Sequence, residues 1–145
     1  MHDLRLNQLT YRTEGKLCRV VLNRPESLNA FSVELVAELD AVSQVVEDDR
    51  SIRVVAITGS GRAFSAGIDL KALSRGEIDH AYLVQWERFL HRLETMDKIV
   101  VCLCHGYFIG VGGQHDSRAA PFVYDGNAVA IGVTEGLVRE NRDVI

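Results

Sequence analysis

Two short apolar runs, each preceded by an amphipathic helical pattern, constrain the fold of this 145-residue chain most strongly. The runs cover residues 53–58 and 99–104, and continuous apolar stretches of this length are typical of buried parallel strands. The first helix is expected from its N-cap Ser32 to the acidic stretch 47–49, and the second begins after Asp79. Strand and helix therefore alternate, which predicts an α/β domain.

Other local patterns complete the expected element order. Residues 4–10 and 17–22 are strand-like and flank the turn-forming stretch 13–16, which predicts an N-terminal hairpin. A short helix is expected after Gly67. The buried face of the second long helix is expected to carry Leu83, Trp86, Leu90, Leu93 and Met96. No repeat or linker divides the chain, so residues 1–145 are interpreted as one domain.

Composition and charge exclude several classes of protein. Hydrophobic residues make up 47% and charged residues 25%, which is typical of globular proteins. The formal charge is −4 and the basic residues are scattered, so a nucleic acid partner is not expected. No apolar run approaches the roughly 20 residues that cross a bilayer, and the N-terminal residues lack a signal-like apolar centre. These features predict no membrane partner and a cytoplasmic location.

The three cysteines predict neither disulfides nor a metal site. An odd count, with Cys102 and Cys104 one residue apart on an apolar strand, suits a reducing compartment. We interpret these two and Cys18 as small buried hydrophobic residues. Cys102, Cys104 and His105 lack a fourth ligand at suitable spacing, so no metal is expected.

A small-residue loop directly follows each of the two buried strands. These loops cover residues 63–71 and 105–114, and ligands of parallel α/β proteins bind at such carboxyl ends of strands. Backbone N–H groups from the two loops could converge on one oxygen, and one donor of such an oxyanion hole contributes about 2.7–4 kcal/mol. The alternative is that the glycines only permit tight turns and close packing, and spacing alone favours this alternative.

Three motifs, in order and sensibly spaced, resemble the crotonase (enoyl-CoA hydratase/isomerase) family. Residues 20–31, VVLNRPESLNAF, resemble its LNRPxxLNA segment, and residues 64–71, FSAGIDLK, are similar to its F(S/A)AGxDLK segment. Residues 106–113 resemble its GyxxGxG loop, and residues 132–135 are a weaker fourth match. The resemblance implies an α/β fold with the crotonase-like ββα spiral core, truncated at its C-terminal end.

The resemblance also implies a ligand, an acyl-CoA thioester, whose enolate is stabilised by two main-chain amides. Carried over, these donors are the N–H groups of Ala66 and Val111. Arg24 and Lys71 are expected near a phosphate, with a solvated surface cation as the alternative for each. Coenzyme A enters only as part of the substrate, and no separate cofactor is expected. The implied coenzyme A contacts are Arg24, Leu28, Ala30, Ala66, Gly67, Ile68, Asp69 and Lys71.

The resemblance implies that a hydratase of this family uses carboxylates at two positions, which Gln114 and Glu135 occupy here. A carboxamide holds water but exchanges no proton near neutral pH, so Glu135 is the candidate acid/base, against the alternative of a surface glutamate. One carboxylate favours double-bond isomerisation over hydration, and hydrolysis stays open. His105 and His115 are candidate bases, although hydrogen bonds that stabilise the loop are favoured for both.

The resemblance weakens towards the C-terminus. Residues 116–125 carry charge and proline where family members have an apolar helix. Family members also continue after Glu135 with a helical portion that closes the coenzyme A pocket and builds the trimer interface. We therefore expect uncovered apolar faces and a homo-oligomer, a trimer or hexamer. Two hypotheses follow: an acyl-CoA isomerase or hydratase, and a noncatalytic acyl-CoA-binding or assembly module.

Overall fold

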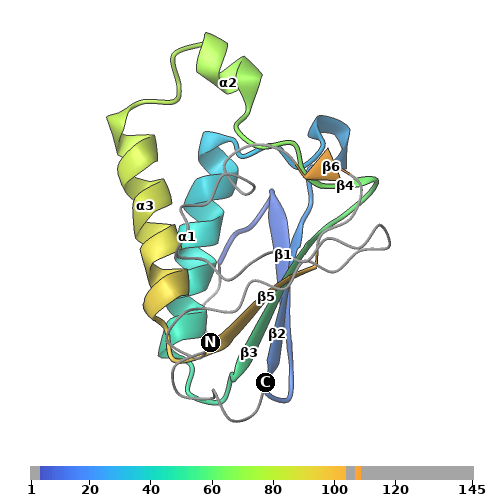
Figure 1. Ribbon diagram of the computed structural model, residues 1–145, viewed down its shortest axis with the longest axis vertical. Helices are drawn as coiled ribbons and strands as arrows, with labels where there is room; N and C mark the ends of the chain where they lie inside the picture. The colour runs from blue at the N-terminus through green and yellow to red at the C-terminus, as the bar shows by residue number, and fades with distance from the viewer. Residues whose placement is uncertain (1–3, 104–106, 109–145) are drawn as a thin grey trace.

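The computed structural model describes residues 4–103 and 107–108 of the chain. A four-stranded sheet forms its centre, with the strand order β1-β2-β3-β5 (Figure 1). β1 pairs with β2 in antiparallel orientation, whereas β2 with β3 and β3 with β5 are parallel pairs. The expected α/β architecture is confirmed. The bounds of these strands are Leu9–Glu14 for β1, Leu17–Leu22 for β2, Val54–Gly59 for β3 and Ile99–Leu103 for β5.

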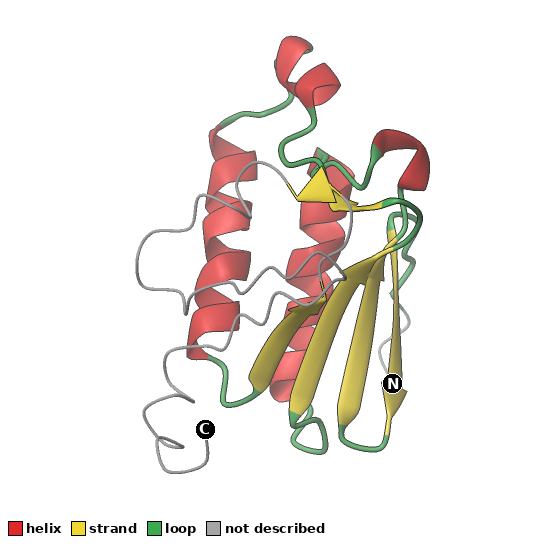
Figure 2. Ribbon diagram, turned by 45° about the vertical axis from the view of Figure 1, so that its right-hand side comes forward, coloured by secondary structure: helices red, strands yellow, loops and turns green. Residues whose placement is uncertain are grey.

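Two long helices pack side by side on one face of this sheet (Figure 2). They are α1 (Val33–Asp48) and α3 (His80–Thr95), and they connect β2 to β3 and β3 to β5. Two short helices, η1 (Pro25–Ser27) and α2 (Leu70–Ser74), lie in the connections near the carboxyl ends of the strands. The core lies between sheet and helices and contains Val20, Leu22, Val55, Ile57 and Val100 from the strands and Leu35, Leu39, Val42, Val46, Trp86 and Phe89 from the helices.

Side-chain caps set the starts of the three α-helices, because each cap satisfies N–H groups that have no partner within the helix. Ser32 Oγ accepts from Leu35 N at 3.2 Å at the start of α1, and Asp79 Oδ1 accepts from Tyr82 N at 2.9 Å at the start of α3. Both expected helix starts are confirmed, as is a short helix after Gly67.

The predicted bounds of the first strand, residues 4–10, are wrong. A two-residue turn with Gly15 at φ +58 joins β1 to β2, so the paired residues run directly up to it, from Leu9 opposite Leu22 to Glu14 opposite Leu17. The residues before β1 are held differently. The carboxylate of Glu38 on α1 accepts hydrogen bonds from the N–H groups of residues 7, 8 and 9 at 2.7, 2.8 and 3.1 Å.

The predicted inner face of α3 is wrong at one position. Leu83 is 47% exposed, and Tyr82 takes the inward position with Trp86 and Phe89. Tyr82 fits there because its hydroxyl donates to the Phe31 carbonyl oxygen at 2.9 Å, and its ring lies in the core. Burial raises the pKa of Tyr82 to about 12, so this donor keeps its proton near neutrality.

Two short strands that were not expected bring the two small-residue loops together. β4 (Ala63–Ser65) lies in the first loop, β6 (Tyr107–Phe108) in the second, and the two form a parallel pair. Ala63 pairs with residue 107 and Ser65 with residue 108, with an irregularity between the two pairs. The segments that follow β3 and β5 are therefore neighbours, as Figure 1 shows near the labels β4 and β6.

Cys18 is buried in the core, as expected, and Cys102 packs against the core while partly buried. Burial raises the pKa of the Cys18 thiol to about 11, which keeps it protonated near neutral pH. Cys104 and His105 lie outside the described residues. In the described part of the chain, no three His, Cys, Asp or Glu residues gather as metal ligands. The described helices include none whose length and apolar character would suffice to span a bilayer.

One arginine connects the two long helices. Arg92 of α3 donates from Nη1 to the Asp40 carboxylate, to the Asp40 carbonyl oxygen at 3.1 Å and to Ser43 Oγ at 2.9 Å. Its Nε lies 3.2 Å from Glu47 Oε2. Because Asp40 is only 8% exposed, its charge depends on this partner, with Arg88 at 3.5 Å in support.

Replacing Arg92 with alanine is expected to lower the free energy of unfolding by about 3 kcal/mol, because a buried carboxylate loses its main partner. Urea unfolding measures this change. The control is Arg12→Ala, since Arg12 pairs with Glu14 while its side chain is 79% exposed. For this control we expect a change below about 0.5 kcal/mol. Equal effects of the two substitutions would contradict a structural role for the Arg92 contacts.

Candidate functional site

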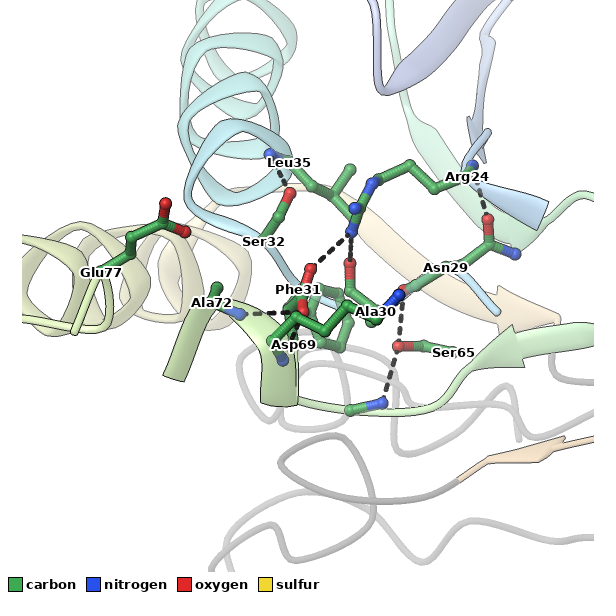
Figure 3. Close-up of polar contacts among 12 residues, drawn as sticks. Arg24, Asn29, Ala30, Phe31, Ser32, Leu35, Ser65, Asp69, Ala72 and Glu77 are labelled. Atoms are coloured by element: carbon green, nitrogen blue, oxygen red, sulfur yellow. Dashed lines mark hydrogen bonds and ion pairs between the residues drawn. The ribbon is translucent and has the colours of Figure 1, made fainter. Parts of the chain in front are cut away.

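The candidate site lies where the segment of residues 24–31 runs along the first small-residue loop. This segment comes from the end of β2 and contains η1, and the loop follows β4. Phe31 and Ile68 form an isolated parallel bridge between them. Both segments leave the carboxyl ends of parallel strands, where the sheet itself offers no further partners. Their backbone groups consequently form hydrogen bonds with each other. Figure 3 shows the side-chain contacts that also join the two segments.

The expected donor at Ala66 is already used within the protein. Its N–H donates to the Leu28 carbonyl oxygen at 2.9 Å. An N–H group has a single proton to donate, so this amide is not free for a ligand oxygen. The assignment of Ala66 as an oxyanion-hole donor is therefore wrong for this structure. The residue is nonetheless in the loop where the donor was expected, and its backbone anchors that loop to the neighbouring segment.

The N–H group of Ile68 differs from those of its neighbours Gly67 and Asp69 in having no acceptor among the described residues. Phe31 N donates to the Gly67 carbonyl oxygen at 2.8 Å, and Asp69 N donates back to the Phe31 carbonyl oxygen at 3.4 Å. Because a trans peptide directs its C=O and N–H to opposite sides, the Ile68 N–H points away from Phe31. No described residue accepts a hydrogen bond from it. Gly67 has φ +90, a conformation that glycine adopts without strain.

The N–H groups of Gly67, Lys71 and Ala72, near Ile68, have side-chain partners. Gly67 N donates to Ser65 Oγ at 3.1 Å, and Lys71 N and Ala72 N donate to Asp69 Oδ1 at 3.0 and 3.1 Å. The peptides that flank Ile68 are thus held by hydrogen bonds, and the Ile68 N–H points away from Phe31, which holds them on one side. This is the backbone geometry that an oxyanion donor requires, because a fixed dipole needs no reorganisation when charge develops.

Arg24 and Asp69 form an ion pair between the two segments. Arg24 Nη1 lies 3.3 Å from Asp69 Oδ2 and donates to the Ala30 carbonyl oxygen at 2.6 Å. Their side chains are only 16% and 11% exposed, so the description of a solvated surface cation does not fit Arg24. Burial by itself would raise the pKa of Asp69, but hydrogen bonds from Ala72 N, Arg24 and Lys71 N outweigh burial and lower that pKa.

The other expected contact residues of this region differ in exposure. Ala30 is buried, Leu28 and Ile68 are half-buried, and Lys71 is exposed. Among the described residues, none forms a salt bridge with the Lys71 side chain. Val111, Gln114, Glu135, His105 and His115 lie outside the described residues, so their predicted roles stay predictions.

Sequence reasoning missed three residues that shape this site: Asn29, Phe31 and Ser65. All three are buried, and each bonds through backbone or side chain to the loop or to its flanks. The signal for them was present, since all three stand within the quoted motifs. A sequence motif does not specify where a polar atom points, so the hydrogen bonds of these three residues could not be predicted from the motifs.

Comparison with known proteins agrees with this geometry. The family model described as enoyl-CoA hydratase/isomerase matches residues 12–138. A Dictyostelium discoideum protein named "Probable enoyl-CoA hydratase, mitochondrial" is 32% identical over 130 residues, which cover 87% of this chain and 45% of that protein. The small ribosomal subunit protein mS47 of Schizosaccharomyces pombe is 33% identical over 108 residues, covering 70% of this chain and 25% of that protein.

A solved structure gives the same result for the fold. The crystal structure of an enoyl-CoA hydratase/carnithine racemase from Magnetospirillum magneticum has a TM-score of 0.68 and 26% identity, covering 74% of this chain and 42% of that one. The chain spans about half the length of the curated relatives that it matches. The crotonase-like core is thus confirmed, and the chain belongs to the enoyl-CoA hydratase/isomerase family.

Proposed function

We propose that the chain binds an acyl-CoA thioester and stabilises its enolate with two main-chain N–H groups, those of Ile68 and Val111. The observation that carries this proposal is the N–H of Ile68, which points away from Phe31 and has no acceptor among the described residues, in a loop whose neighbouring peptides are held. A thioester carbonyl oxygen gains negative charge when a proton leaves the α carbon, and fixed N–H dipoles stabilise that charge. Ile68 thereby replaces Ala66 as the donor of the first loop.

The pairing of β4 with β6 supports Val111 as the second donor. Ser65 pairs with residue 108, so β4 and β6 end beside each other. Ile68 follows Ser65 by three residues, and Val111 follows residue 108 by three as well. The two amides thus stand at equal sequence distance from one paired position, and we propose them on this basis as joint donors to one oxygen.

For the coenzyme A portion, the two expected cations have different roles. The guanidinium of Arg24 is occupied by Asp69 and by the Ala30 carbonyl oxygen, which favours a structural role for both charged residues. The amine of Lys71 is exposed at the start of α2 and is the better candidate for a phosphate contact. Leu28 and Ile68, which are half-buried, are the other proposed contacts of this portion, whereas Ala30 and Gly67 are buried.

Chemistry beyond enolate stabilisation is proposed from the family resemblance. Glu135 is the acid/base that moves the proton and Gln114 holds water or the acyl group, so isomerisation is favoured over hydration. The relatives named enoyl-CoA hydratase support chemistry of the lyase or isomerase type. We also propose a homo-oligomer, a trimer or hexamer, as its assembled form. A cytoplasmic location stays a prediction, since one relative is named as mitochondrial.

A second function is favoured by a specific relative. The match to a ribosomal subunit protein indicates that the fold also occurs in a protein named for an assembly. The alternative proposal is therefore a noncatalytic acyl-CoA-binding or assembly module. It shares the crotonase-like core with the first proposal, and the two differ in whether an enoyl-CoA is turned over.

Replacing Ile68 with proline removes the proposed donor, because proline has no N–H. We expect the affinity for acetoacetyl-CoA, followed by the ultraviolet band of its enolate, to fall about a hundredfold. Ile68→Ala keeps the N–H and should stay within a few-fold of the wild type. Circular dichroism and urea midpoints verify that both variants fold. An undiminished enolate band in folded Ile68→Pro would rule out this donor.

The Arg24–Asp69 pair gives the stability a dependence on pH. The folded-state pKa of Asp69 is lowered, so its charge stabilises the fold above the unfolded pKa near ~3.9, and this contribution is lost as pH falls through the folded value. Asp69→Asn retains a good N-cap for α2 but removes the charge. The variant should be less stable than the wild type at neutral pH, with the gap closing in acid. A gap independent of pH in urea titrations would contradict the assignment.

Replacing Glu135 with glutamine separates the two functions. For a catalyst, turnover of an enoyl-CoA should fall by a factor of about 10²–10⁴, since the carboxamide exchanges no proton. Exposed Glu87 on α3 provides the control, and Glu87→Gln should keep full activity. A wild-type chain that binds coenzyme A thioesters without turnover, and is indifferent to Glu135→Gln, would establish the binding module instead.

A further inference from the structure

Two consecutive residues next to the first loop have a left-handed backbone. Leu28 has φ +51 and Asn29 has φ +54. Residues other than glycine rarely adopt this region, and leucine does so less readily than asparagine. Such a conformation persists only where surrounding contacts hold it, and it occurs often at functional sites.

The carboxamide of Asn29 holds the turn. Asn29 is fully buried, its Oδ1 accepts from Arg24 N at 2.8 Å, and its Nδ2 donates to the carbonyl oxygens of Ser60 and Ala63 at 2.9 Å each. Both Nδ2 protons are used. Gly59 leaves room for this group, because a Cβ there would lie 2.8 Å from Nδ2 and 2.5 Å from the Phe64 carbonyl oxygen.

The turn presents two successive carbonyl oxygens to the loop. That of Leu28 accepts from Ala66 N at 2.9 Å, and that of Asn29 accepts from Ser65 Oγ at 2.8 Å. The same hydroxyl accepts from Gly67 N at 3.1 Å, so Ser65 connects the turn to the peptide just before the Gly67–Ile68 peptide. Figure 3 shows Ser65 between Asn29 and the loop. Ser65 is only 2% exposed, and therefore water cannot readily replace it.

We propose that Asn29 and Ser65 are positioning residues that set the direction of the Ile68 N–H. This inference rests on the proposed function, since it assigns a purpose to that N–H. Neither side chain touches the acyl group. Asn29 fixes the turn, and Ser65 connects the turn to the N–H of Gly67. The N–H of Phe31 donates to the carbonyl oxygen of Gly67. Both the N–H and the carbonyl group of Gly67 are thus held, which fixes the Gly67–Ile68 peptide that carries the donor.

The chain contains a matched control for Ser65. Ser43 on α1 is also buried, its hydroxyl donates to the Asp40 carbonyl oxygen at 2.7 Å, and it accepts from Arg92 Nη1 at 2.9 Å. Ser65→Ala and Ser43→Ala thus each remove one buried hydroxyl that donates to a carbonyl and accepts from an N–H. We expect similar losses of stability from the two substitutions, measured as urea midpoints on the full chain.

The two variants should differ at the site. Ser65→Ala is expected to lower the affinity for acetoacetyl-CoA roughly three- to tenfold and to reduce the enolate fraction of the bound ligand, the size expected for one hydrogen bond. Ser43→Ala should leave both unchanged. Equal losses of the enolate band in the two variants would reduce Ser65 to a structural role and overturn the inference.

Amide hydrogen exchange at Gly67 gives a readout that needs no ligand. Ser65→Ala should speed exchange of the Gly67 N–H relative to the core amides of β3, whereas Ser43→Ala should not. Unchanged exchange at Gly67 overturns the positioning role by itself. A wild-type chain that binds acetoacetyl-CoA without an enolate band overturns the proposed function instead, so the two failures are distinguishable.

Discussion

The hydrogen bond from Phe31 N to the Gly67 carbonyl oxygen is the contact on which the geometry of the site depends. A peptide group is planar, so holding its oxygen also fixes the direction of its N–H. Here the held peptide is the one between Gly67 and Ile68, and its N–H points away from the segment that holds it. The fold contributes to this site by placing the segment of residues 24–31 against the loop after β4.

The parallel sheet and its helices supply that placement. β2, β3 and β5 run in the same direction, so the segments after them emerge at one edge. α1 and α3 pack on one face and are tied by Arg92, and the Arg24–Asp69 pair then joins the segment after β2 to the loop after β3. The two charged residues of this pair thus orient the backbone of both segments, and their side chains are accordingly turned inward.

Much of the fold could be predicted from residue patterns, because burial imposes a period on the sequence. Apolar spacing and the caps Ser32 and Asp79 located both long helices, and the two apolar runs located β3 and β5. The inner face of α3 was harder to predict from the sequence. Tyr82 and Leu83 are both apolar enough for the core, and Tyr82 is the one that also forms a hydrogen bond there, to the Phe31 carbonyl oxygen.

The site was predictable in location but not in atomic detail. Glycine-bounded loops at the carboxyl ends of strands indicated a ligand site, yet every residue from 66 to 69 contributes an N–H with the same chemistry. Which one is free depends on the left-handed conformation of Leu28 and Asn29 and on the partners of Gly67. Those are tertiary features, and the β4–β6 pair, formed by residues more than forty positions apart, is another.

The stretching frequency of the thioester carbonyl tests the free Ile68 donor most directly. An acyl-CoA labelled with carbon-13 at this carbonyl allows its infrared band to be isolated when bound to the full chain. We expect the band to move to lower frequency than in water, because a directed N–H polarises the C=O bond more than mobile solvent does. A carbonyl band that keeps its solution frequency while the coenzyme A portion is bound would contradict this role of Ile68.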